Sequence, residues 1–216
     1  MKLTSELLLR AYAHGIFPMA ESATSPALYW FEPTWRGILP LDRFHASRSL
    51  VRSFRRGGWR LSCDRDFAGV LAGCADRDET WINAEIARVF SKLHAEGHAH
   101  SIEVREPAGG LVGGVYGLAM GAAFFAESKF SRRADASKLA LAELVARLRR
   151  GGFRLLDVQY LTPHLARLGA IEVPRETYRR QLAVALAARA DHARAFAVEN
   201  PESPSGAYWQ PITQTS

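Results

Sequence analysis

The chain has 216 residues, 48% of them hydrophobic, which is enough to bury one large core or two modest ones. No apolar run reaches the roughly 18–20 residues of a membrane span, the N-terminus lacks the core of a signal peptide, and the two cysteines fit no metal-ligand spacing. The sequence therefore predicts a cytoplasmic protein with no metal site, and its net charge of +6 indicates an anionic partner.

The first 60 residues are predicted to form a small N-terminal α/β domain. Thr4 is placed to cap a helix over residues 5–14, and Gly15 is placed to end it. A loop-rich stretch with several aromatic side chains, Trp30 among them, follows Pro18. A second helix is expected over residues 47–56, and we expect this domain to contribute to binding of an anionic polymer.

That second helix carries most of an arginine cluster, which consists of Arg48, Arg52, Arg55, Arg56 and Arg60. The first four lie within one broad face of the predicted helix. A run of charges is most often a solvated helix face, but no carboxylate lies between Arg43 and Arg60 to neutralise this one. Uncompensated guanidinium groups bind phosphates well, so we expect a nucleic-acid surface here.

Residues 61–190 are predicted to form a second domain whose elements alternate between strands and helices. Strands are expected at about 59–63, 100–105, 111–120, 122–128 and 153–159, and helices at 64–75 (with Asp64 as its cap), 83–96, 135–150, from 162 onward and at 174–189. This order resembles that of N-acyltransferases of the acetyl-CoA-dependent superfamily. It implies an α/β (α+β) fold, with a mixed sheet flanked by helices. Residues 191–216 are expected to form a flexible tail.

The strand at 153–159 ends with two polar residues on one face, Asp157 and Gln159. Burying a carboxylate and an amide without hydrogen-bond partners is costly, so a structural or functional role must explain why both stand in a buried strand. It is either a hydrogen-bonded pair that caps the next helix or part of a site at the end of the strand, where such folds commonly place their chemistry.

Motifs along residues 7–181 together resemble the leucyl/phenylalanyl-tRNA–protein transferase family. In the first half they are His-Gly-Ile-Phe-Pro-Met (14–19), Arg-Gly-Ile-Leu-Pro (36–40), Phe-His-Ala-Ser-Arg-Ser-Leu (44–50), Thr-Trp-Ile (80–82) and Leu-His-Ala-Glu-Gly-His-Ala-His-Ser-Ile-Glu-Val (93–104). In the second half they are Leu-Val-Gly-Gly-Val-Tyr-Gly (111–117), Glu-Ser (127–128), Phe-Ser (130–131), Asp-Ala-Ser-Lys (135–138), Leu-Asp-Val-Gln (156–159) and Gly-Ala-Ile-Glu-Val-Pro-Arg (169–175).

The resemblance implies an enzyme that transfers leucine or phenylalanine from tRNA to the α-amine of proteins beginning with arginine or lysine, marking them for degradation. It implies no cofactor, a monomer, and catalysis by Asp157 and Gln159, in which Asp157 polarises an amide that orients the amine. Glu127 would meet the cationic side chain of the acceptor, unless it is a strand glutamate in a surface salt bridge. Ser128, Lys129 and Leu156 would contact substrate.

The resemblance also places Trp30 and Trp81 near the 3′-terminal adenosine, although core packing is the usual fate of a single tryptophan. The arginine cluster would hold the acceptor stem by its phosphates.

Two residues depart from the family pattern. Lys129 stands where methionine usually lines the leucine pocket, and Arg105 stands where tryptophan is usual. An ammonium in an apolar pocket is costly unless it swings out or finds a carboxylate such as Glu127 or Asp157. Two alternatives therefore stay open, an altered choice of donor amino acid and a non-catalytic tRNA-binding paralogue. An acyl-CoA N-acetyltransferase is disfavoured, because the turn over residues 130–138 has no glycine with which to cradle a pyrophosphate.

Overall fold

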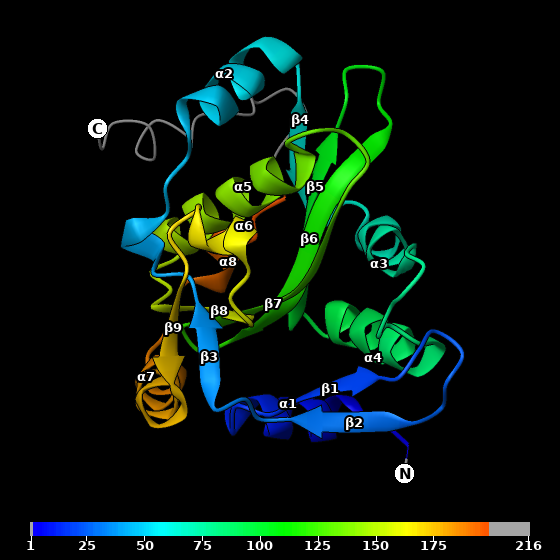
Figure 1. Cartoon of the computed structure of the whole chain (residues 1–216), viewed down its shortest axis with the longest axis vertical. Helices are drawn as coiled ribbons and strands as arrows, with labels where there is room; N and C mark the ends of the chain where they lie inside the picture. The colour runs from blue at the N-terminus through cyan, green and yellow to red at the C-terminus, as the bar shows by residue number, and fades with distance from the viewer. Residues whose placement is uncertain (1, 199–216) are drawn as a thin grey trace.

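The computed structural model describes residues 2–198, and its centre is a mixed seven-stranded sheet (Figure 1). The strand order is β4-β5-β6-β7-β8-β3-β9. Among these neighbours only β7 and β8 run parallel. The strands are β3 (Trp35–Ile38), β4 (Arg60–Cys63), β5 (Ala99–Arg105), β6 (Leu111–Met120), β7 (Ala123–Ser131), β8 (Leu155–Gln159) and β9 (Ile171–Pro174).

Helices cover both faces of this sheet, as Figure 1 shows. The helix α5 packs on one face with α2, α6 and α8, whereas α1, α3, α4 and α7 pack on the other. Their bounds are α1 (Ser5–Ala13), α2 (Arg48–Gly57), α3 (Phe67–Ala75), α4 (Ala84–Ala95), α5 (Ala136–Arg150), α6 (Pro163–Ala166), α7 (Arg175–Ala187) and α8 (His192–Ala195). The predicted order of strands and helices over residues 59–189 is confirmed except at β9, a short strand between α6 and α7 that the sequence did not predict.

Side-chain caps begin several of these helices. Thr4 accepts a hydrogen bond from the Leu7 N–H at the start of α1, and Thr162 does the same at α6, where Pro163 is the first helical residue. The prediction for α3 was wrong by two residues, because Asp66 is the cap. Asp64 instead has a positive φ of 56° and accepts hydrogen bonds from His100 and the Ser101 N–H.

The first 60 residues contain strands that the sequence did not predict. The strands β1 (Phe17–Ala20) and β2 (Leu28–Phe31) form a separate antiparallel pair, and β3 joins the large sheet between β8 and β9. A 3₁₀ turn, Leu41–Arg43, connects β3 toward α2. Part of this N-terminal segment is therefore built into the sheet that carries Asp157.

At the other end, residues 191–198 pack against the fold, although the sequence suggested a tail beginning at 191. Asp191 caps α8, Phe196 is buried, and its ring stacks on His100 with centroids 3.6 Å apart. The rest of the predicted tail, 199–216, lies outside the described residues. Among the described helices, none is long and apolar enough to cross a membrane.

Candidate functional site

The strands β7 and β8 pair over only three positions, and the candidate site lies where they separate. Their last partners are Phe125 and Asp157. Just beyond this point the pairing of β7 with β6 shifts, because Tyr116 faces Ser128 whereas Gly117 faces Ala126. Glu127 is thus the extra residue of a β-bulge, a feature that commonly re-aims a side chain. Gln159, at the end of β8, has a φ of +56°, and its Nε2 donates to Glu127 Oε1 at 3.2 Å.

Asp157 is held in a buried ion pair with Arg36 of β3. Arg36 Nε lies 2.9 Å from Asp157 Oδ1, and Arg36 Nη2 lies 2.7 Å from Oδ2. The exposed fractions of the two side chains are 1% and 0%. Burial alone would lower the pKa of Arg36, but the Asp157 carboxylate outweighs it and the pKa is raised.

Further contacts saturate this ion pair. The Tyr178 hydroxyl donates to Asp157 Oδ2 at 2.5 Å, and the Gln159 backbone N–H donates to Oδ1 at 2.8 Å. Arg36 donates to the Gly15 carbonyl at 3.0 Å and lies between the rings of Phe17 and Tyr178. Asp157 therefore fixes the backbone of Gln159. The expectation that it polarises the Gln159 side-chain amide was wrong, because that amide donates to Glu127.

Glu127 is a buried carboxyl group that accepts hydrogen bonds from two side chains. Besides Gln159, the Tyr12 hydroxyl of α1 donates to Glu127 Oε2 at 2.6 Å. Burial raises the pKa of Glu127 to about 8, against the hydrogen bonds from Tyr12 and Gln159, which favour the charged form. The group therefore changes charge near neutral pH, which is where a group that exchanges protons or binds cations is most responsive. The alternative of a surface salt bridge at Glu127 was wrong.

A small hollow of about 80 Å³ adjoins the Glu127–Gln159 pair. Its apolar lining is Val115, Ala126, Leu141, Val158 and Leu165, and its polar lining is Glu127, Ser128, Lys129 and Gln159. An apolar cavity beside a few converging polar groups is the usual form of a small-molecule site. The structure thus brings together four of the residues that the sequence assigned to substrate or catalysis.

Lys129 is half-buried at the edge of this hollow. Burial, together with the positive charge of Arg77, lowers its pKa. Neither Glu127 nor Asp157 pairs with its ammonium among the interactions of residues 2–198, so the carboxylate partner suggested by the sequence is not found there.

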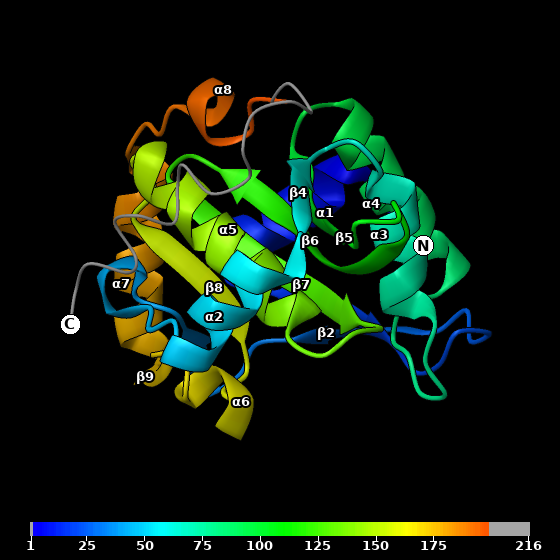
Figure 2. The same ribbon diagram turned by 90° about the horizontal axis from the view of Figure 1, so that it is seen from above.

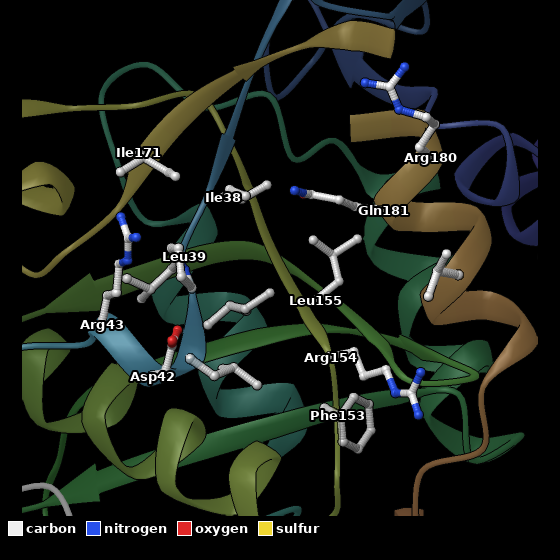
Figure 3. Close-up of a pocket in the computed structure, with 14 residues that line it drawn as sticks. Ile38, Leu39, Asp42, Arg43, Phe153, Arg154, Leu155, Ile171, Arg180 and Gln181 are labelled. Atoms are coloured by element: carbon white, nitrogen blue, oxygen red, sulfur yellow. The ribbon is translucent and has the colours of Figure 1, made fainter. Parts of the chain in front are cut away.

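Leu156 is placed apart from the Glu127–Gln159 hollow. It lies in the core and lines a larger hollow of about 700 Å³ at the opposite end of β8. Figure 3 shows this second hollow, in which Arg43, Arg154 and Arg180 surround aliphatic side chains such as Leu155 and Ile171. None of the predicted catalytic residues lines it.

The two tryptophans also lie outside the hollow. Trp30 is on β2, is 36% exposed and lines a separate hollow of about 170 Å³ with Leu28 and Pro26. Trp81 is half-buried just before α4 and packs against the core. Its carbonyl accepts the Ala20 N–H at 3.1 Å, which ties this loop to β1.

The arginine cluster is exposed along α2 and at the start of β4. All five side chains, those of Arg48, Arg52, Arg55, Arg56 and Arg60, are solvent-accessible. Within the described part of the chain none of them makes an ion pair. Ser47 caps α2, whose apolar Leu50 packs into the core. Figure 2 shows α2 beside α5, and the arginine side chains of α2 are exposed. The predicted uncompensated surface is therefore present.

Sequence reasoning missed three residues of the site, namely Arg36, Tyr178 and Tyr12. Arg36 stands in the Arg-Gly-Ile-Leu-Pro motif, and a lone arginine entering an apolar strand was a usable signal. The sequence around the two tyrosines gave no such signal, because Tyr178 and its partner Asp157 are 21 residues apart and Tyr12 and its partner Glu127 are 115 residues apart.

Comparisons with known proteins identify the family. The family model for leucyl/phenylalanyl-tRNA protein transferase matches residues 38–183, and that for its N-terminal domain matches residues 1–34. A relative from Ruegeria pomeroyi, "Leucyl/phenylalanyl-tRNA--protein transferase", is 59% identical over 216 residues, covering 100% of both chains. One of the same name from Cereibacter sphaeroides is 62% identical over 191 residues, covering 88% of this chain and 89% of its own.

Among solved structures, "Crystal structure of FemX" matches with a TM-score of 0.51 at 13% identity, covering 78% of this chain and 66% of the other. At this identity the match concerns the fold alone, and it agrees with the predicted mixed sheet flanked by helices.

Proposed function

The chain belongs to the leucyl/phenylalanyl-tRNA–protein transferase family and is an aminoacyl-tRNA-dependent aminoacyltransferase that acts on protein N-termini, and we propose that the Glu127–Gln159 pair is its reaction centre. The observation that carries the proposal is this hydrogen-bonded pair, buried where β7 and β8 separate and open to an apolar hollow.

The reaction asks for positioning more than for strong acid or base chemistry. An aminoacyl ester is already activated, so the enzyme must align the attacking α-amine, remove a proton from it and stabilise the tetrahedral oxyanion. An amide oxygen is barely basic. Gln159 therefore orients the amine, with Nε2 held by Glu127 and Oε1 left to accept a hydrogen bond from the nucleophile.

Glu127 meets the positive charge of an acceptor whose first residue is arginine or lysine. Its pKa of about 8 means that it is largely protonated at neutral pH in the absence of acceptor. A cation close to it favours the carboxylate, so acceptor binding is coupled to loss of a proton from this site. Asp157 acts as a positioning residue, since it contacts the backbone N–H of Gln159 and holds Arg36.

The donor binds by its aminoacyl group and by its phosphates. The apolar lining beside Gln159 receives the leucine or phenylalanine side chain, with Ser128 and Lys129 at its border. Leu156, which the resemblance assigned to substrate, is buried in the core and lines the other hollow, so it is not part of this donor site. The arginine cluster of α2 holds the acceptor stem without reading its sequence, and Trp30 and Trp81 stack on the 3′-terminal adenosine.

In this proposal residues 1–60 contribute to tRNA binding and residues 61–190 carry the chemistry. The enzyme is cytoplasmic, monomeric and cofactor-free, and its products are substrates for degradation.

A transfer panel tests the proposed function. The donors are leucyl-, phenylalanyl- and methionyl-tRNA, and the acceptors are matched peptides that begin with arginine, lysine, alanine or glutamate. We expect product with the leucyl and phenylalanyl donors and the two basic acceptors. Transfer to all four acceptors alike would contradict the role of Glu127, and tRNA binding without any transfer would favour a non-catalytic paralogue.

A further inference from the structure

Another hollow, distinct from that of Figure 3, adjoins the Glu127–Gln159 site and shares Lys129 with it. It has a volume of about 450 Å³ and lies between the end of α3, the end of β7, the start of α5 and α6. Its basic lining side chains are Arg77, Lys129, Arg132 and His164.

Its positive charge is only partly neutralised. Asp76, which lines the hollow, pairs with Arg132 at 3.2 Å. Arg77 donates to the Ser128 hydroxyl at 3.3 Å and to the Lys129 carbonyl, and among the described residues it pairs with no carboxylate. The Lys129 ammonium likewise has no ion pair within residues 2–198.

His164 adds an unsatisfied polar atom. Its Nε2 is buried and finds no hydrogen-bond partner in the described part of the chain. Burial, together with the charges of Lys129, Lys138 and Arg167, lowers the pKa of His164. A buried polar atom without a partner calls for an explanation such as a ligand. An anion in this hollow would pair with Lys129 and Arg77 and could accept a hydrogen bond from the imidazole.

We propose that this hollow binds a phosphate group of the 3′-terminal nucleotide of the donor, with Lys129 as its central ligand. The inference rests on the proposed function, because the ligand is then part of the aminoacyl-tRNA itself. Lys129 borders both hollows. In the donor the amino acid is esterified to the 3′-terminal ribose, so when its carbonyl lies beside Gln159 the 5′-phosphate of the same nucleotide is one ribose away, on the side where Lys129 joins the two hollows.

The proposal gives the lysine a role that the apolar pocket does not require. Leucine or phenylalanine is then selected by the aliphatic lining, Val115, Leu141, Val158 and Leu165, while Lys129 serves the phosphate. Burial and the charge of Arg77 lower the pKa of Lys129, and a bound phosphate would oppose this shift by favouring the protonated form.

Two minimal donors that differ by one phosphate separate these functions, namely 3′-O-leucyl-adenosine and its 5′-phosphate. For the wild-type enzyme we expect the phosphorylated donor to have a KM about tenfold lower, which is typical of one charge-assisted contact. Lys129→Met should remove this advantage and leave kcat within about twofold, and Lys129→Arg should retain it. Lys92→Met, at an exposed lysine on α4 that pairs with Glu96, is the matched control and should change nothing.

Equal KM values for the two donors in the wild-type enzyme would overturn the proposal. An equal loss with both donors in Lys129→Met would also overturn it, because the lysine would then act on the aminoacyl pocket. Arg132→Gln, which is 54% exposed, is a second variant that tests the same hollow if Lys129→Met does not fold.

Calorimetry with AMP and with adenosine tests the phosphate site without any need for amino-acid transfer. If the wild-type protein transfers no amino acid at all, the proposed function fails. A preference for AMP over adenosine that is lost in Lys129→Met would still support the phosphate hollow, and no preference would refute it. With leucyl-tRNA, the same variant should reduce the slope of log affinity against log salt by about 0.7, the value for one phosphate of a single strand.

Discussion

Replacing Asp157 by alanine should destabilise the protein strongly, because it leaves the Arg36 guanidinium buried without its counter-ion. Arg36 is 1% exposed and makes three charge-assisted hydrogen bonds of 2.7–3.1 Å with this carboxylate. Breaking one partner of a buried pair costs about 3–5 kcal/mol in the free energy of unfolding. For a chain of this size each kcal/mol lowers Tm by about 2–4 °C, so Tm should fall by about 6–20 °C.

Urea unfolding followed by circular dichroism measures this loss. The double variant Arg36→Met/Asp157→Leu is the control, and it should be less destabilised than Asp157→Ala because it leaves no unpaired charge in the core. Part of the loss will remain, since the Tyr178 hydroxyl and the Gln159 N–H no longer have an acceptor. If Asp157→Ala changes the free energy of unfolding by less than about 1 kcal/mol, the ion pair does not stabilise the site as described.

Three further changes test other parts of the site. Because the pKa of Glu127 is raised, the folded state holds a proton that the unfolded state releases, so the free energy of unfolding should decrease as pH rises from about 4.5 to about 8. In Glu127→Gln, urea unfolding across this range should show a smaller decrease. A decrease as large as in the wild type would contradict this prediction. Calorimetry in buffers of different ionisation enthalpy should detect proton release when a peptide with N-terminal arginine binds to the wild-type protein, and none when it binds to Glu127→Gln. Equal proton release in both proteins would exclude Glu127 as the group that loses the proton. Replacing Arg52 and Arg55 by alanine should weaken tRNA binding and lower its salt slope by about 0.9 for each duplex phosphate that the variant no longer binds; filter-binding constants with an unchanged slope would place the acceptor stem elsewhere.

The sequence predicted the second half of the fold well because its signals there are local. The cap at Thr162, the alternation along β8 and the apolar residues of α5 each depend on residues close together in the chain, as does the cap at Thr4 in the first half. The strands β1, β2, β3 and β9 are only four residues long, which gives a periodic pattern little to act on, although β4, of the same length, was predicted. The strand β3 becomes a strand by pairing with β8 and β9, which lie more than 100 residues later.

The residues at the centre of the site could be predicted from the sequence, but the hydrogen bonds between them could not. Glu127 and Gln159 were assigned from their motifs, and the structure brings them within hydrogen-bond distance. The side-chain amide of Gln159 reaches Glu127 because of a β-bulge at Glu127 and a positive φ at Gln159. A glutamate or a glutamine in a sequence does not by itself predict either feature. The partners of Asp157 came from β3 and α7, contacts that no spacing along the chain encodes.

The most direct test of the Glu127–Gln159 pair as reaction centre is the rate of leucine transfer from leucyl-tRNA to a peptide with N-terminal arginine, measured for Gln159→Ala beside the wild-type enzyme. Among residues 2–198 the Gln159 side chain makes one hydrogen bond, to Glu127, so the variant should keep nearly the full free energy of unfolding and the affinity for tRNA. We expect kcat to fall by about a hundredfold, the usual cost of misplacing the reacting groups. Transfer at the wild-type rate by a folded Gln159→Ala protein would contradict this account.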